Sequence, residues 1–124
     1  MADTVIIGKY RKLIESLYKK TDSGNLTWEP SVLFGGFETR VGDKLVIFDM
    51  VHTGASVPDY EIKIANAELK IVESFRDTDL HDEGASDVLG FPTYFRLMEA
   101  MYGSIQRKNS GVEAILDDLI DNLS

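Results

Sequence analysis

Residues 37–48, FETRVGDKLVIF, decide the fold of this chain. Two charged residues, Glu38 and Arg40, alternate with less polar ones up to Val41, which is the pattern of a strand with one buried face. Gly42-Asp43 then favours the tight turn that joins two antiparallel strands. The run LVIF that follows is apolar on both faces, as in a central strand that is covered from both sides. The stretch therefore predicts a β-hairpin inside a larger sheet.

Further strands flank this hairpin. Upstream, Leu26 and Trp28 alternate with polar residues before Pro30, which ends a short strand because proline cannot donate to the ladder. Downstream, Asn66-Ala67 is the expected turn between two alternating runs, which contain Tyr60, Ile62 and Ile64, then Leu69, Ile71, Glu73 and Phe75. Connections this short force antiparallel pairing, because parallel neighbours need a crossover of a dozen residues or more.

A helix is expected on each side of the sheet region. From Thr4 to Lys20 the apolar residues recur every three or four positions, and Gly24 is a C-terminal stop signal. After the sheet, Pro92 suits the first turn of a second helix. The apolar stripe of this second helix holds Phe95, Leu97, Met98, Met101, Tyr102 and Ile105.

A third helix is expected at the C-terminal end. Ser110 followed three residues later by Glu113 predicts a capping box, in which each side chain satisfies an exposed amide of the first turn. The apolar face of this helix comprises Val112, Ile115, Leu116, Leu119, Ile120 and Leu123. Asp117, Asp118 and Asp121 are expected to face water.

The order of these elements predicts an α+β fold. We expect a single domain over residues 1–124, because a chain of this length leaves no room for a second core. It should consist of an N-terminal helix, a curved antiparallel sheet of about five strands, and two C-terminal helices packed on one face.

Composition excludes several classes of function. The net charge of −8 opposes contact with nucleic acid and with anionic membranes. Cysteine is absent, so disulfides, thiol nucleophiles and thiolate metal sites are excluded. The apolar cluster at residues 5–7 is far shorter than a signal-peptide core or a membrane span. We expect a cytoplasmic protein.

Charge is distributed unevenly along the chain. Residues 1–20 hold five basic and two acidic side chains, whereas residues 76–124 hold four basic and ten acidic ones. Ends of opposite sign attract each other, either within one fold or between two copies.

The sequence offers little for catalysis or metal binding. His52 and His81 lie about thirty residues apart, and neither stands in a helical pair with a second ligand. In the acidic loop from Asp77 to Asp87, carboxylates alternate as in a calcium loop, but aspartate occupies the place that requires glycine. Gly35-Gly36 precedes a strand, so it indicates a bend or bulge rather than a phosphate cradle. We expect no metal, no cofactor and no catalytic residue.

Four aromatic residues are the candidates for a binding surface: Trp28, Phe34, Phe37 and Tyr60. Aromatic side chains gather at recognition surfaces, where they supply much of the binding energy. Alternating aromatics in strands are, however, more often part of a core. Both interpretations remain open at this point.

A set of residues near the start gives a resemblance. A helix is followed by threonine, glycine, an apolar residue, tryptophan and glutamate, at Leu13, Leu17, Thr21, Gly24, Leu26, Trp28 and Glu29. This order resembles small α+β proteins of bacteria and prophages that continue with an antiparallel sheet and finish with a leucine-rich helix. No activity is established for that family, so the resemblance implies a fold and a bacterial setting but no catalytic residue.

The main functional hypothesis is a non-catalytic protein-interaction module, an acidic binder of the immunity or chaperone type. Exposed sheet edges and the terminal helix are its expected contact surfaces, with a protein partner and a homodimer as expected assemblies. The alternative is a small-ligand-binding domain whose pocket lies between sheet and helices, lined by Trp28, Phe37 and Tyr60. An enzyme that uses His52 or the acidic loop with a divalent ion is the third hypothesis.

Overall fold

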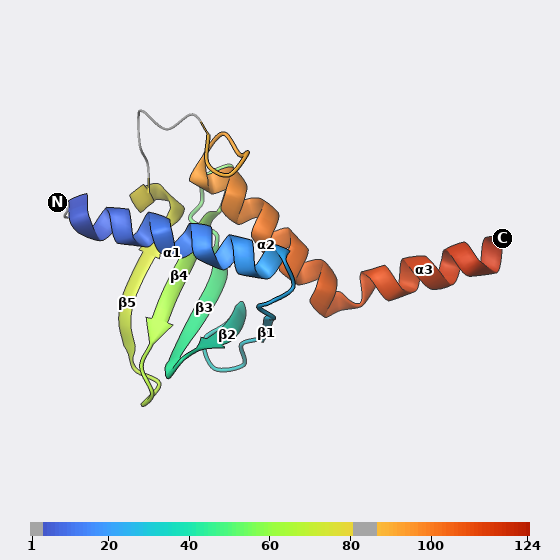
Figure 1. The fold of residues 1–124 in the computed structure, drawn as a ribbon, viewed down its shortest axis with the longest axis horizontal. Coiled ribbons are helices and arrows are strands. Elements are labelled where there is room, and N and C mark those ends of the chain that lie inside the picture. Colours follow the sequence, from blue (N-terminus) through green and yellow to red (C-terminus); the bar gives the residue numbers. More distant parts are fainter. Residues whose placement is uncertain (1–3, 81–86) are drawn as a thin grey trace.

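The computed structural model describes residues 4–80 and 87–124 and confirms the α+β fold (Figure 1). The described elements, in chain order, are α1 (Thr4–Asp22), β1 (Glu29–Pro30), β2 (Phe37–Val41), β3 (Lys44–Val51), β4 (Asp59–Ala65), β5 (Ile71–Arg76), the 3-10 turn η1 (Asp77–Leu80), α2 (Tyr94–Ser110) and α3 (Val112–Leu123). No helix within these ranges combines the length and the apolarity that a membrane crossing requires.

The five strands form an open antiparallel sheet in the order β1-β2-β3-β4-β5. The hairpin predicted from residues 37–48 is present: Val41 pairs with Lys44 around the Gly42-Asp43 turn, and Gly42 has a φ of 63°. Phe48 in β3 lies opposite both Phe37 in β2 and Ile62 in β4. The short connections therefore set the neighbours of each strand, as expected.

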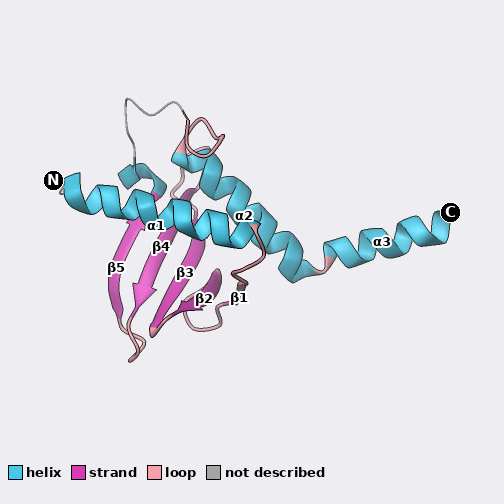
Figure 2. Ribbon diagram, viewed as in Figure 1, coloured by secondary structure: helices cyan, strands magenta, loops and turns pink. Residues whose placement is uncertain are grey.

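The two long helices α1 and α2 lie together over one face of the sheet (Figure 2). Their apolar stripes enclose the main core with the inward side chains of β3 and β4. Ile14 of α1, Phe48 of β3, Ile62 of β4 and Leu97 of α2 are each completely buried there. Thr93 begins α2 by accepting a hydrogen bond from the Arg96 amide, so Pro92 stands before the cap rather than in the first turn.

The other face of β3 is covered by the connection between β1 and β2. Leu45, Ile47 and Ala65 are buried on this side, and Phe34 packs against them. The connection is held by backbone hydrogen bonds between residues 31 and 35 and between 31 and 36, with Gly35 and Gly36 both at positive φ. The prediction that LVIF is covered on both sides is confirmed, and Gly35-Gly36 forms the expected bend.

Two local predictions were wrong. The first strand contains only Glu29 and Pro30, not Leu26 and Trp28, because the segment before Glu29 does not pair with β2. The capping box is absent as well. Ser110 belongs to α2, where its hydroxyl donates to the Arg107 carbonyl, and the left-handed Gly111 that precedes α3 has no side chain to cap it.

The last helix also departs from expectation. Of the two C-terminal helices only α2 packs on the sheet, while α3 extends away from it (Figure 1). None of the α3 residues is buried. The acidic side chains of α3 face water as predicted, but its apolar side chains do so too.

Gly36 gives a test of this fold. A methyl group in Gly36→Ala would meet the Phe48 carbonyl oxygen and lie 2.9 Å from the Asp49 Cα, at a φ of +68°. We expect the free energy of unfolding to fall by about 3 kcal/mol, since strain and overpacking add. In the control Gly42→Ala the φ is +63° but no atom lies within 4 Å, so a loss of about 1 kcal/mol is expected. Urea denaturation measures both, and equal losses would contradict the close packing at Gly36.

Candidate functional site

The four aromatic candidates lie on two different faces of the sheet. Trp28 and Tyr60 are buried in the main core, where their ring centroids lie 5.9 and 6.1 Å from that of Phe48. Phe37 is half-buried and packs against the same core. Phe34 lies on the opposite face of the sheet. The structure thus brings three of the four together as core residues, and a binding role for the set stays a prediction.

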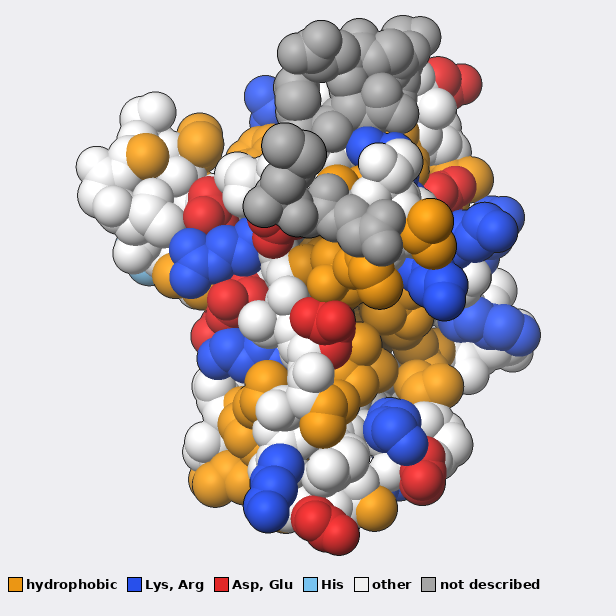
Figure 3. Space-filling model, turned by 90° about the vertical axis from the view of Figure 1, so that its left-hand side faces the viewer, with side chains coloured by type: hydrophobic (Ala, Val, Ile, Leu, Met, Phe, Trp, Pro, Cys, Tyr) orange, Lys and Arg blue, Asp and Glu red, His pale blue; other side chains and the backbone are white. Residues whose placement is uncertain are grey.

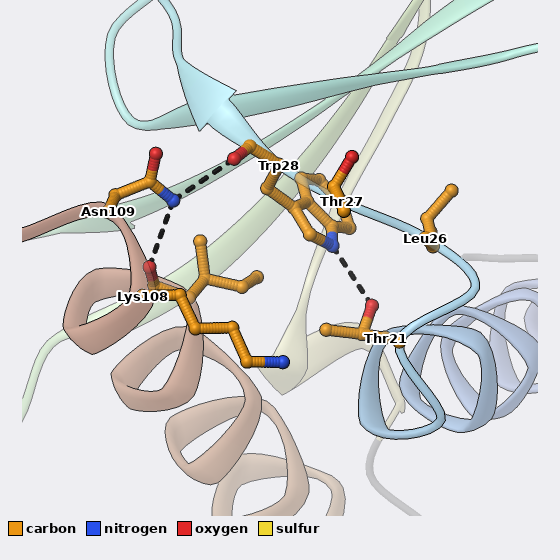
Figure 4. A pocket seen from close by; sticks show the side chains of 8 residues that line it. Thr21, Leu26, Thr27, Trp28, Lys108 and Asn109 are labelled. Carbon is orange, nitrogen blue, oxygen red and sulfur yellow. Dashed lines mark hydrogen bonds between the residues drawn. The ribbon is translucent and has the colours of Figure 1, made fainter. Parts of the chain in front are cut away.

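Trp28 does, however, reach a cleft at the C-terminal ends of α1 and α2 (Figure 4). This cleft, which we call the end cleft, has a volume of about 250 Å³. Its lining is mostly apolar and consists of Thr21, Gly24, Leu26, Thr27, Trp28, Ile105, Lys108 and Asn109. The cleft therefore joins three segments that are distant in the sequence.

Three hydrogen bonds hold the walls of the end cleft in place (Figure 4). The Trp28 indole N–H donates to the Thr21 hydroxyl over 2.9 Å, which ties the tryptophan to α1. The Asn109 side-chain amide donates to the carbonyls of Trp28 and Ile105, each over 3.0 Å, which ties the same segment to α2. Within the described residues every buried side-chain nitrogen or oxygen has a partner. The cleft is thus preformed, and it offers mainly apolar surface.

A second hollow lies on the other side of the α2 terminus. This shallow hollow has a volume of about 470 Å³ and is lined by Pro30, Gly36, Phe37, Tyr102, Gln106, Asn109 and Ser110. Asn109 borders both depressions, and α3 begins three residues after it. The base of α3 is therefore surrounded by concave, largely apolar surface.

The largest group of exposed apolar side chains on one described element belongs to α3. The exposed fractions are 57% for Ile115, 52% for Leu116, 52% for Leu119, 62% for Ile120 and 86% for Leu123. At helical spacing these side chains share one side, which we call the α3 face. Glu113 lies at the edge of this face, Asp117 and Asp118 lie further round the helix on either side of it, and Asp121 lies opposite it. The result is an amphipathic helix with no cover on its apolar side.

Charge around the end cleft has the opposite sign to that of α3. The last turns of α1 and α2 carry Lys19, Lys20, Arg107 and Lys108, all exposed, and we call these four residues the basic rim; Asp22, the last residue of α1, is the one acidic side chain among them. Lysine and arginine side chains also gather along the right-hand side of the molecule in Figure 3, the side that α1 occupies. Cations at helix C-termini interact favourably with the helix dipole.

The candidates for catalysis find no support in the described residues. His52 lies in the exposed loop between β3 and β4, and His81 lies outside the described residues, as does much of the acidic loop. Among residues 4–80 and 87–124, no three histidine or carboxylate side chains come close enough to hold a metal ion.

The described carboxylates of the acidic loop have structural roles. Asp77 accepts a hydrogen bond from the Tyr60 backbone N–H over 2.8 Å, and Asp79 accepts one from the Arg76 N–H over 2.9 Å. Arg76 in turn pairs with Asp59 at 3.0 Å and with Glu61 at 3.1 Å. These contacts join the ends of β4 and β5. The carboxylates of Asp77 and Asp79 are each hydrogen-bonded to a backbone amide.

The bond between Trp28 and Thr21 gives a prediction for the end cleft. In Thr21→Val the side chain keeps its shape but the buried indole N–H loses its acceptor. We expect the free energy of unfolding to fall by about 1–3 kcal/mol. Thr27→Val changes an exposed threonine of the same cleft, so its effect should stay within about 0.5 kcal/mol. Urea unfolding monitored by the fluorescence of Trp28 measures both, and equal effects would argue against this bond.

Asp77 gives a prediction for pH. Burial raises the pKa of Asp77, and the charges of Asp59 and Asp79 act in the same direction. A carboxyl whose pKa is raised by folding contributes most stability below its ordinary pKa of about 3.9, and this contribution is lost as pH rises through the folded value. Asp77→Asn keeps an oxygen that can accept from Tyr60 but cannot ionise. We therefore expect it to raise stability relative to the parent at pH 7 more than at pH 3.

Urea midpoints of the Asp77→Asn variant and the parent at both pH values measure this difference. Asp79→Asn is the matched control, because it replaces an exposed carboxylate that also accepts a backbone hydrogen bond. A stability difference for Asp77→Asn that is the same at pH 3 and pH 7 would contradict the prediction.

Comparison of the chain with protein-family models, curated proteins and solved structures found no match. The resemblance carried by residues 13–29 therefore stays a prediction.

Proposed function

We propose that this protein is a non-catalytic protein-interaction module that binds its partner through the α3 face. The observation that carries the proposal is an amphipathic helix without cover: α3 has a continuous apolar side and no buried residue. Apolar patches of this kind on a protein surface mark interaction sites. The net charge of −8 fits an acidic binder of the immunity or chaperone type.

The length of α3 supports this proposal. Isolated helices shorter than about 12–15 residues are marginal in water, and most helices in proteins depend on packing of their apolar face. With 12 residues, α3 lies at this limit, and its own body buries none of its residues. Covering a leucine or isoleucine side chain contributes roughly 1.5–3 kcal/mol. A partner on the α3 face would therefore stabilise the helix and the complex together.

The edge of the sheet is a weaker candidate for the contact. In the described sheet β5 pairs only with β4, so one row of its backbone groups has no strand partner there, and its residue Val72 is 55% exposed. Such an edge can accept an added strand. β5 is only six residues long, however, and its exposed apolar side chains are fewer than those of α3.

The end cleft is the observation that favours the alternative, a small-ligand-binding function. The cleft is preformed and includes the only tryptophan. Its volume of about 250 Å³ lies below the roughly 300–1,000 Å³ of typical ligand pockets. A cleft of this size with apolar walls is better suited to side chains of a protein partner.

Site-specific photo-crosslinking tests the proposed function. A photoreactive phenylalanine analogue replaces Leu119, at the centre of the α3 face, and in the control variant it replaces Asp121 on the far side. Irradiation in cells should give a discrete protein adduct from position 119 and at least about tenfold less from position 121. Gel shifts and mass spectrometry of the adduct measure this. The absence of any adduct from position 119 would contradict the proposed function.

A further inference from the structure

We propose that the partner of the α3 face is a second copy of this chain, and that each copy lays its α3 across the end cleft and basic rim of the other. This inference rests on the proposed function, and it names the occupant of the interface. Reciprocal exchange of a terminal element is a low-cost route to a two-fold symmetric dimer. Three features of the described residues lead to it.

The first feature is charge complementarity. α3 has four acidic side chains and no basic one, while the last turns of α1 and α2 contribute the four cations of the basic rim. Glu113 lies at the edge of the α3 face, so it would lie beside the rim when that face is covered. Complementary charges of this kind set the register and orientation of an interface.

The second feature is the connection between α2 and α3. Antiparallel packing of two consecutive helices requires a loop of about 2–5 residues. Here the single residue Gly111, with a φ of 72°, separates Ser110 from Val112. α3 therefore cannot turn back along α2 to cover the end cleft of its own copy, and Figure 1 shows it directed away from the body.

The third feature is the shape of the receiving surface. The end cleft presents apolar walls from Leu26, Trp28 and Ile105, with Lys108 at its border, and it lies next to the shallow hollow. Its volume of about 250 Å³ accommodates the tips of leucine and isoleucine side chains. Because each copy has one α3 and one end cleft, a closed dimer covers both α3 faces at once.

Pairing of two α3 helices with each other is the competing arrangement. It would bring together two helices that each carry four carboxylates, without a single cation on either. Like charges across an interface oppose association. The basic rim would also remain unused, so the charge pattern favours contact between α3 and the body.

A charge-exchange experiment tests the proposal on the full-length chain. The rim variant carries Lys20→Glu and Lys108→Glu, and the helix variant carries Glu113→Lys. The control variant, Asp121→Lys, makes the same change of charge on the far side of α3. Sedimentation equilibrium measures the dimer dissociation constant of each variant and of an equimolar mixture of the rim and helix variants.

We expect the parent chain to dimerise, and the rim and helix variants each to bind themselves at least about tenfold more weakly. Their mixture should form a heterodimer with affinity near that of the parent, because both reciprocal contacts then join opposite charges. The control variant should dimerise within about threefold of the parent. Recovery in the mixture also shows that both variants are folded.

Three outcomes would overturn the inference. A parent chain that is monomeric at all concentrations excludes the second copy as partner. A rim variant that dimerises like the parent would point to pairing between α3 helices. A mixture that stays monomeric would show that the two surfaces do not meet. If the photo-crosslink from position 119 still joins another protein in any of these cases, the proposed function stands without the dimer.

Discussion

The two-sided burial of β3 is the constraint on which the rest of the structure depends. Phe48 and Ile47 are neighbours in the chain, so they point to opposite faces of the sheet, and both are completely buried. One face of β3 therefore needs a layer of helices, and the other needs a cover of its own. α1 and α2 provide the first, and Phe34 on its glycine-containing connection provides the second.

This constraint also shapes the end cleft. Trp28 precedes β1 and packs against Phe48. The segment before β1 therefore runs between the C-terminal ends of α1 and α2. Thr21 and Asn109 then satisfy the polar groups that this path would otherwise bury without a partner. The cleft is thus a consequence of core packing, and the cations at the helix ends give its border a positive charge.

Residue patterns predicted most helices and strands of the sheet layer and its helical cover. In these elements the local periodicity and turn residues favour the same structure that burial of the apolar side chains requires. Alternation in β3 and β4, the Gly42-Asp43 turn and the stripe of α1 all lead to the elements that the structure contains. The prediction was wrong where one residue pattern is compatible with two different local structures. Ser110 and Glu113 have the spacing of a capping box, but Ser110 continues α2 because Gly111 takes up the change of direction. Leu26 and Trp28 alternate like a strand, although pairing with β2 begins only at Glu29.

The sequence by itself determined the fold class, the order of the strands and the amphipathic character of α3, because these depend on periodicity, turn chemistry and short connections. It did not reveal whether the apolar side of α3 is covered, since an apolar stripe is the same for a core helix and for a docking helix. The tertiary structure decided this through the one-residue junction at Gly111, which directs α3 away from the sheet. The end cleft could not be predicted from the sequence either, because Thr21, Trp28 and Asn109 come together only when both helices pack on β3.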